Sequence, residues 1–180
     1  GADKVAINSA ALQDPTLLRR AADEHGSQCV VAAVDVRRTD ASWAVFSEAG
    51  RRPTGRDALA WCQEAADLGA GELLVTSVDR DGTGAGYDRP LYERLRARLR
   101  VPIVASGGCG TAEDVVALFR SGSADGALLA SRLHTGGLRL GEIRAAMRSA
   151  GLPDPLRRPP RDANRSSCRW SSRTSTADGC

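Results

Sequence analysis

Asp35 is the residue of this sequence whose type and position best suit proton transfer. It follows the apolar run Val30-Val31-Ala32-Ala33-Val34 and so stands at the end of an expected buried strand. Burial raises the pKa of a carboxyl group, as a general acid or base requires. An ion pair with Arg37 or Arg38, or a capping role, explains the same position equally well. The residues alone leave these roles open.

Three short segments of glycine and other small residues predict a binding site for phosphate. They are Asp81-Gly82-Thr83, Ser106-Gly107-Gly108 and Ala130-Ser131, and each follows an expected strand. Small residues in such positions let backbone N–H groups approach an anion. Simple turns use the same residue types, but three successive segments of this kind favour phosphate more than any one of them does.

Asn8 and Ser9 directly follow the first expected strand. Their amide and hydroxyl groups could contact a second phosphate, although capping of the next helix is the commoner use. Cys109 lies beside one glycine-rich segment, with no base in the nearby sequence to activate its thiol. The five cysteines have no spacing typical of zinc ligands, so we expect neither a metal nor another cofactor.

Short apolar runs alternate with longer amphipathic stretches, which is typical of strand–helix units around a parallel sheet. Strands are expected over 4–7, 28–36, 72–78, 102–105 and 126–129, a hairpin near 43–50, and a loop around His134. Helices are expected over 14–26, 56–68, 90–99 and 140–150, with another beginning at Thr111, where Thr111 and Asp114 have the spacing of a capping box. Five such units fit either a doubly wound sheet or part of a (β/α)8 barrel, and in both the ligand lies beyond the carboxyl ends of the strands.

The chain has 180 residues, fewer than the roughly 250 of a complete (β/α)8 barrel. We expect a partial barrel over 1–152 and a disordered segment rich in Arg, Ser and Pro over 153–180. Residues 151–180 carry six Arg and three Asp, which accounts for the whole formal charge of +3 and leaves the remainder neutral. A neutral domain disfavours nucleic acid as a partner, and no apolar run is long enough to span a membrane, so we expect a cytoplasmic protein.

Several strings of this sequence resemble the cyclase subunit of imidazole glycerol phosphate synthase, an enzyme of histidine biosynthesis. They occur in the family's order along 1–150, at 1–11, 26–35, 69–77, 79–83, 105–108 and 130–131. The resemblance implies an α/β fold, a (β/α)8 TIM barrel of which this chain holds strands four to eight with their helices. It also implies a lyase that uses ammonia to close an imidazole ring.

The same resemblance implies roles for the residues singled out above. Asp35 would be one of two catalytic aspartates and act as a general acid or base in ring closure. The substrate that this resemblance implies is a ribulosyl aminoimidazole carboxamide ribotide with a phosphate at each end. One phosphate would contact Asp81, Gly82, Gly107, Gly108, Ala130 and Ser131. Asn8 and Ser9 would contact the other phosphate, while Lys4 and Glu72 would form half of a gate for ammonia from a glutaminase partner in a heterodimer.

The match does not include the family's first catalytic aspartate or the glycine-rich loop that completes the second phosphate site. We therefore expect a truncated chain that is inactive alone. Cys109 and Arg132 occupy positions where the family usually has Ala and a bulky apolar residue. Two alternatives remain, namely the sister phosphoribosyl isomerase of the same pathway, which would act without ammonia, and a non-catalytic phosphate-binding half-barrel.

Overall fold

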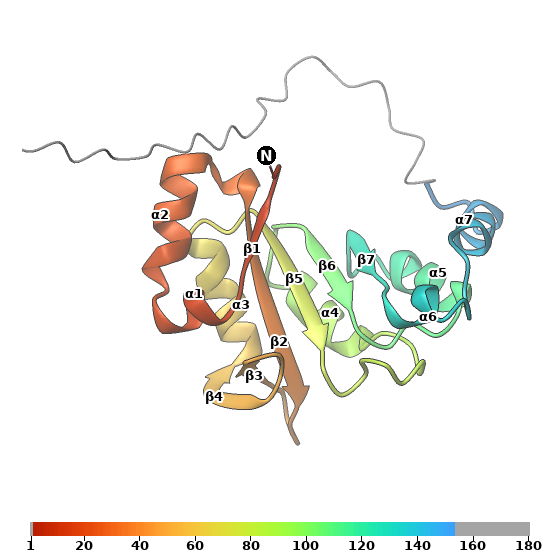
Figure 1. Ribbon diagram of the computed structural model, residues 1–180, viewed down its shortest axis with the longest axis horizontal. Coiled ribbons are helices and arrows are strands. Elements are labelled where there is room, and N and C mark those ends of the chain that lie inside the picture. The colour runs from red at the N-terminus through yellow and green to blue at the C-terminus, as the bar shows by residue number, and fades with distance from the viewer. Residues whose placement is uncertain (1, 154–180) are drawn as a thin grey trace, which may run out of the picture.

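The computed structural model describes residues 2–153. The segment expected to be disordered, 153–180, lies outside the described residues except for Pro153. The described part is an α/β fold in which a mainly parallel sheet is flanked by helices, consistent with a TIM-barrel-like fold (Figure 1). None of its helices is long and apolar enough to cross a membrane.

The parallel strands follow one another in space in the same order as in the sequence. They are β1 (Val5–Ile7), β2 (Val30–Arg38), β5 (Glu72–Ser77), β6 (Ile103–Ser106) and β7 (Gly126–Leu128), and each pairs with the next. A doubly wound sheet reverses its strand order at a switch point, whereas this sheet progresses in one direction. Of the two architectures that the sequence allowed, the observed order favours part of a (β/α)8 barrel.

A β-hairpin follows β2, as the residues near 43–50 predicted. Its strands, β3 (Trp43–Ser47) and β4 (Arg52–Asp57), are antiparallel. β3 pairs with the last four residues of β2, Asp35 to Arg38, whereas β1 pairs with the first three. The hairpin therefore stands at the carboxyl end of β2, beside Asp35.

The helices connect the strands largely where the amphipathic stretches predicted them. They are α1 (Ser9–Gln13), α2 (Thr16–His25), α3 (Ala58–Asp67), α4 (Arg89–Arg96), α5 (Ala112–Arg120), α6 (Ser131–His134) and α7 (Leu140–Ser149), with a short 3-10 helix η1 (Ser27–Cys29) before β2. The capping box at the start of α5 is confirmed, because Asp114 N–H donates to Thr111 Oγ1 and Thr111 N–H donates to Asp114 Oδ2.

Three local predictions were wrong. Residues 56–57 belong to β4 and not to the following helix, because the Asp57 side chain accepts the N–H of Ala60 at 2.9 Å and so caps α3. Residues 28–29 lie in η1, and β2 instead continues to Arg38, where β3 pairs with it. The segment around His134 forms the short helix α6 and not a loop.

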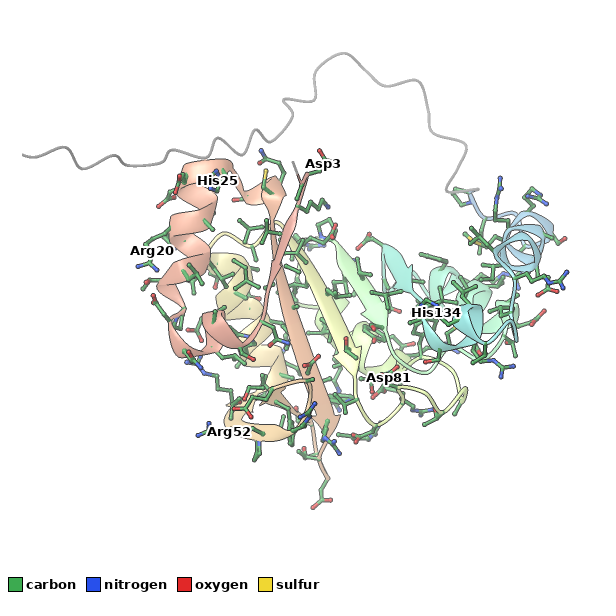
Figure 2. The ribbon with its side chains drawn as sticks, viewed as in Figure 1. Asp3, Arg20, His25, Arg52, Asp81 and His134 are labelled. Carbon is green, nitrogen blue, oxygen red and sulfur yellow. The ribbon has the colours of Figure 1, made fainter. Side chains whose placement is uncertain are left out.

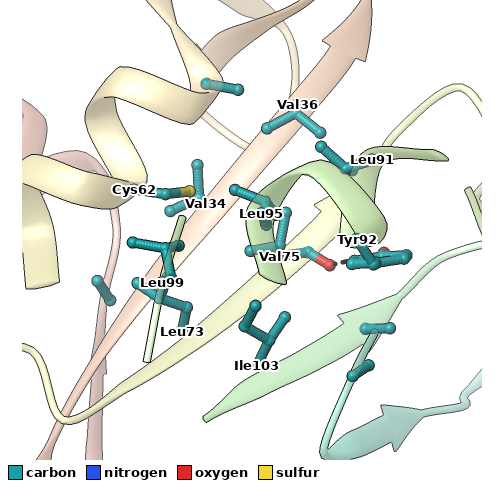
Figure 3. Close-up of a cluster of buried hydrophobic side chains, with 14 of the residues drawn as sticks. Val34, Val36, Cys62, Leu73, Val75, Leu91, Tyr92, Leu95, Leu99 and Ile103 are labelled. Atoms are coloured by element: carbon teal, nitrogen blue, oxygen red, sulfur yellow. Dashed lines mark hydrogen bonds between the residues drawn. The ribbon is translucent and has the colours of Figure 1, made fainter. Parts of the chain in front are cut away.

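The hydrophobic core lies between the sheet and the helices on one face. Alternate strand residues point into it, among them Val34, Val75 and Ile103, and cluster with Leu91 and Leu95 of α4 (Figure 3). Each fully buried side chain of this size stabilises the fold by about 1.5–3 kcal/mol. In Figure 1, α3 and α4 lie behind the strands, and no helix crosses in front of β2 and β5.

The other face of the sheet is more open. Here Ala33 pairs with Leu74, and Asp35 pairs with Thr76, and all four are only partly buried. We call this the open face. In a closed barrel it would face the interior, and it is the face that carries Asp35.

Candidate functional site

Asp35 lies near the carboxyl end of β2, on the open face of the sheet. Its side chain is partly buried, and its Oδ2 accepts a hydrogen bond from Asn8 Nδ2 at 3.1 Å. The remaining amide oxygen, Asn8 Oδ1, is buried without a hydrogen-bond partner among the described residues. β1 pairs with β2, so the residue that ends the first strand reaches the carboxylate on the second. The arrangement leaves Asp35 with one neutral partner and an exposed side.

The alternative roles considered for Asp35 are wrong. Arg37 instead places Nη1 3.6 Å from a carboxylate oxygen of Asp79, and Arg38 lies 3.9 Å from Asp88. Asp35 is also inside a strand and not at a helix start. The carboxylate is therefore not neutralised by either neighbouring arginine.

The surroundings of Asp35 favour its protonated form. Burial raises the pKa of Asp35, the hydrogen bond from Asn8 lowers it, and the nearby Asp81 carboxylate raises it, with a net value above the ordinary 3.8. A carboxyl group with a raised pKa can donate a proton and take it back, which is the requirement for a general acid or base. Asp35 pairs with Thr76 of β5, and Asp81 belongs to the loop that follows this strand.

That loop forms a pocket together with the loops that follow β6 and β7. The pocket is lined by 81, 82, 84, 106–109 and 128–132. These include every residue predicted for the first phosphate site, namely Asp81, Gly82, Gly107, Gly108, Ala130 and Ser131. The expected convergence of the three segments is confirmed, and their role in binding phosphate stays a prediction. We call this the loop pocket.

Backbone donors in the wall of the loop pocket are unused. Within residues 2–153, the N–H groups of Gly82, Gly107, Gly108 and Ser131 make no hydrogen bond to another backbone group. Gly82 has a φ of +74°, and a Cβ atom there would meet nothing within 4 Å, so the space on that side of Gly82 is open. Unpaired N–H groups on a concave wall suit an anion such as phosphate.

Gly107 and Gly108 also have a packing role. A Cβ atom on Gly107 would lie 2.5 Å from Ser77 O, and one on Gly108 would collide with Gly86 O. Gly86 N–H in turn donates to Gly108 O at 2.8 Å. The loops after β5 and β6 are thus packed backbone against backbone, which requires glycine. This contact sets the shape of the loop pocket.

Tyr92 of α4 holds the start of the loop that follows β6. Its hydroxyl accepts the N–H of Ser106 at 3.1 Å and lies 3.0 Å from Ser106 O and 3.1 Å from Val75 O. Figure 3 shows Tyr92 beside Val75. The hydroxyl has one proton, so it donates to one of these carbonyls at a time. The buried contact fixes the end of β6 directly before Gly107.

Asn8 and Ser9 do not line the loop pocket. Asn8 contacts Asp35, and Ser9 Oγ accepts the backbone N–H of Glu48, in the turn of the hairpin, at 3.3 Å. The commoner alternative for Asn8 is wrong, because its side chain makes no capping hydrogen bond to α1. A second phosphate site at these two residues stays a prediction.

Lys4 and Glu72 lie at the opposite, amino end of the sheet. Lys4 Nζ and Glu72 Oε2 form an ion pair of 2.5 Å. Figure 2 shows Asp3, the neighbour of Lys4, at the end of the molecule away from Asp81. Glu72 pairs with Val31, and alternate residues of a strand share a face. Glu72 and Asp35 therefore belong to the two ends of the same open face.

Asp88 is a polar residue that sequence reasoning missed. It is 3% exposed, and its Oδ2 accepts hydrogen bonds from Trp43 Nε1 at 2.7 Å and from Ser77 Oγ at 3.4 Å. These contacts join the hairpin to the end of β5 and to the loop before α4. Trp43 and Asp88 are 45 residues apart, and no local pattern indicated their contact.

Comparisons with known proteins identify the family of this chain. Residues 1–139 match the family model described as "Histidine biosynthesis protein". The chain belongs to this family. It is 55% identical over 157 residues to the "Imidazole glycerol phosphate synthase subunit HisF" of Synechococcus sp., covering 85% of this chain and 62% of that protein.

Other HisF relatives match the chain with similar identity and coverage. The Streptococcus sanguinis protein is 50% identical over 153 residues, covering 84% of this chain and 61% of the relative. The Myxococcus xanthus protein is 49% identical over 152 residues, covering 84% and 60%. The chain thus spans about three fifths of the length of these relatives. Their shared name supports the HisF cyclase subunit over the sister isomerase.

Proposed function

We propose that this chain carries a large part of the cyclase site of imidazole glycerol phosphate synthase. The reaction uses ammonia to convert a ribulosyl aminoimidazole carboxamide ribotide into imidazole glycerol phosphate and aminoimidazole carboxamide ribotide, in the cytoplasm. The observation that carries the proposal is the position of Asp35 near the carboxyl end of β2, paired with Thr76 of the strand whose following loop lines the loop pocket. The similarity to HisF proteins supports the same reaction.

Asp35 is the residue that we assign to proton transfer. Ring closure requires protons to be added to and removed from the reacting nitrogen and oxygen atoms, and a carboxyl group near its pKa can do both. The amide of Asn8 holds Oδ2 of Asp35, which leaves Oδ1 to exchange the proton. A fixed orientation of this kind removes part of the entropic cost of reaching the transition state.

The loop pocket is assigned to one phosphate of the substrate. Its free N–H groups come from three loops that are packed on one another, so they do not have to be ordered when the anion binds. Asn8 and Ser9 are assigned to contacts with the second phosphate, near the hairpin turn at Glu48. Two such contacts would fix both ends of the substrate across Asp35.

The Lys4–Glu72 pair is assigned to the entry of ammonia. We propose that a glutaminase subunit docks at the amino end of the sheet as the partner of a heterodimer and releases ammonia there. From Glu72, the open face continues through Leu74 and Ala33 to Asp35. These small and apolar side chains would leave ammonia uncharged on its way to the substrate.

We propose that the 180-residue chain alone binds phosphate without catalysing turnover, because the described residues supply one suitable carboxylate and one complete anion pocket. The test is to give the purified chain ammonia and substrate, alone and together with the part of the Synechococcus HisF protein that it does not match. We expect a trace rate alone and formation of imidazole glycerol phosphate from the mixture.

The outcome of this experiment separates the alternatives. More than a trace of product from the chain alone would contradict the expected dependence on further elements. Isomerisation of the pathway's preceding ribotide without ammonia would indicate the sister isomerase. Phosphate binding with no rescue of activity would indicate a non-catalytic phosphate-binding half-barrel.

A further inference from the structure

Arg132 is a cation in the wall of the loop pocket that the proposed reaction does not use. It lies in α6, directly after Ser131, and its Nε donates to Gly110 O at 3.2 Å. Among the residues that line this pocket, Arg132 is the only positively charged side chain, and Asp81 is the only negatively charged one. The charge of the pocket therefore depends on these two residues.

The guanidinium group of Arg132 is available to a ligand. Nε makes its one recorded hydrogen bond to the described residues, and no carboxylate among residues 2–153 pairs with it. An arginine presents five N–H donors in one plane, so most of its donors remain unused here. These unused donors, on an exposed cation that lines an anion pocket, can bind an anion that enters from solution.

The backbone around Arg132 is shaped to hold its side chain. A Cβ atom on Gly137 would lie 3.0 Å from Arg132 Cζ and 3.2 Å from Nη1, so the absence of a side chain at Gly137 makes room for the guanidinium group. Leu138 N–H donates to Arg132 O at 3.1 Å and closes the turn over it. The guanidinium group thus lies close to Gly110 and Gly137, while Arg132 itself is an exposed residue.

The charge of Arg132 acts inside the pocket. Cys109 lines the same wall, and its pKa is raised, mainly by burial, while Arg132 is among the groups that lower it. Without Arg132 the only charge in the lining would be the Asp81 carboxylate, which repels phosphate. An arginine can pair with two phosphate oxygens at once and favours the more highly charged anion.

We propose that Arg132 pairs with a dianionic phosphate group in the loop pocket and determines the charge selectivity of that site. The inference rests on the proposed function, because it assumes that phosphate occupies this pocket. It goes beyond that function in assigning the selectivity to a residue whose position is usually apolar in the family. Backbone N–H groups would define where the phosphate lies, and Arg132 would define which charge state is preferred.

The first test is calorimetric titration of the full chain with inorganic phosphate near neutral pH. We expect Arg132→Gln to weaken binding by about tenfold, as the loss of a charge-assisted hydrogen bond does. The phosphate affinity of Arg132→Lys should lie between those of Arg132→Gln and the unmodified chain, because lysine keeps the charge and loses the planar pair of donors. Arg100→Gln, which removes the same charge from an exposed residue outside the pocket, is the matched control and should bind phosphate unchanged.

The second test uses Cys109 as a reporter of the pocket. Iodoacetamide labelling of Cys109, quantified by peptide mapping, should slow when phosphate is added to the unmodified chain. In Arg132→Gln the labelling without phosphate should itself be slower, because loss of the cation raises the pKa of the Cys109 thiol. The protection by phosphate should also require a higher phosphate concentration. Circular dichroism confirms that each variant is folded.

The outcomes distinguish this inference from the proposed function. Equal phosphate affinity of Arg132→Gln and the unmodified chain would overturn the role of Arg132 and leave the loop pocket and the cyclase proposal standing. No phosphate binding by the unmodified chain would overturn the role of Arg132 together with the phosphate assignment of the pocket. Formation of imidazole glycerol phosphate in the reconstitution experiment decides the cyclase proposal independently.

Discussion

Asp35 and Asp88 stand near the same edge of the sheet and are held in opposite ways. Asp88 is 3% exposed, with Trp43 and Ser77 donating to one oxygen and Arg38 lying 3.9 Å from the other. Asp35 is partly exposed and has the Asn8 amide as its one recorded hydrogen-bond donor. The two hydrogen-bond donors of Asp88 come from the hairpin and from β5, and the nearby Arg38 cation comes from β2, so this carboxylate joins elements of the fold.

This contrast separates carboxylates that can transfer protons to a ligand from carboxylates that hold the fold together. A buried carboxylate that accepts hydrogen bonds from several elements of the fold has a structural task, because taking up a proton would weaken those contacts. A carboxylate with a single neutral donor and an accessible oxygen can exchange its proton with a ligand. The partners of the two residues, and not burial alone, separate a proposed catalytic acid from a structural one.

The largest expected effect is on catalysis by Asp35. In the reconstituted enzyme, Asp35→Asn should lower the rate of imidazole glycerol phosphate formation by about 10²–10⁴-fold, because it removes the group that transfers protons. The rate is measured with saturating ammonia. The unfolding midpoint of the chain should not decrease, which distinguishes lost chemistry from lost structure. A variant that retains the unmodified rate would remove Asp35 from the mechanism.

Asp88 should show the reverse pattern. Asp88→Ala leaves the buried Trp43 Nε1 without its acceptor and should lower the free energy of unfolding by about 3 kcal/mol. Urea unfolding of the chain, followed by circular dichroism, measures this loss. Asp40→Ala, at an exposed position of the loop after β2, is the control and should cost less than about 0.5 kcal/mol. Equal losses in the two variants would contradict the structural role of Asp88.

Substitution of a third carboxylate, Asp57, should lower stability less than substitution of Asp88. Asp57→Ala should lower the free energy of unfolding by about 1 kcal/mol at neutral pH, because α3 loses its N-terminal cap. Burial raises the pKa of Asp57, but hydrogen bonds from Ala60 and Ser42 bring it below the ordinary value of 3.8. The contribution is therefore present above pH 3.8 and is lost as the pH falls through the lowered pKa. Asp57→Asn, which keeps a capping oxygen, should restore most of the loss.

The smallest effect is the pH dependence of stability that Asp35 contributes, and it has the opposite sign. Because its pKa in the folded chain is raised above 3.8, folding favours the protonated form, and stability decreases as the pH rises through the interval above 3.8. Asp35→Asn should therefore be more stable than the unmodified chain at neutral pH, with the advantage fading toward acid pH. Thermal unfolding at a series of pH values measures the difference. A constant difference at all pH values would contradict the raised pKa.

Much of the architecture could be predicted from local patterns. The apolar run before Asp35 identified β2, and the Thr111–Asp114 spacing identified the start of α5, because both depend on neighbouring residues. Convergence of the segments at Gly82, Gly107 and Ser131 followed from parallel strands, whose carboxyl ends meet at one edge. Helix α1 and the exact end of β2 were missed, since pairing with β3 extends β2 beyond its apolar run.

The strand–helix units, the place of Asp35 after an apolar run and the glycine-rich segments of the loop pocket can be read from the sequence, since each depends on periodicity or on local backbone geometry. The single-direction strand order and the partners of the polar side chains emerge from tertiary packing. Asn8 contacts Asp35, Trp43 contacts Asp88, and Arg132 contacts Gly110. These hydrogen bonds join residues that are 22 to 45 positions apart, so their formation depends on how the sheet and its loops pack and leaves no local pattern in the sequence.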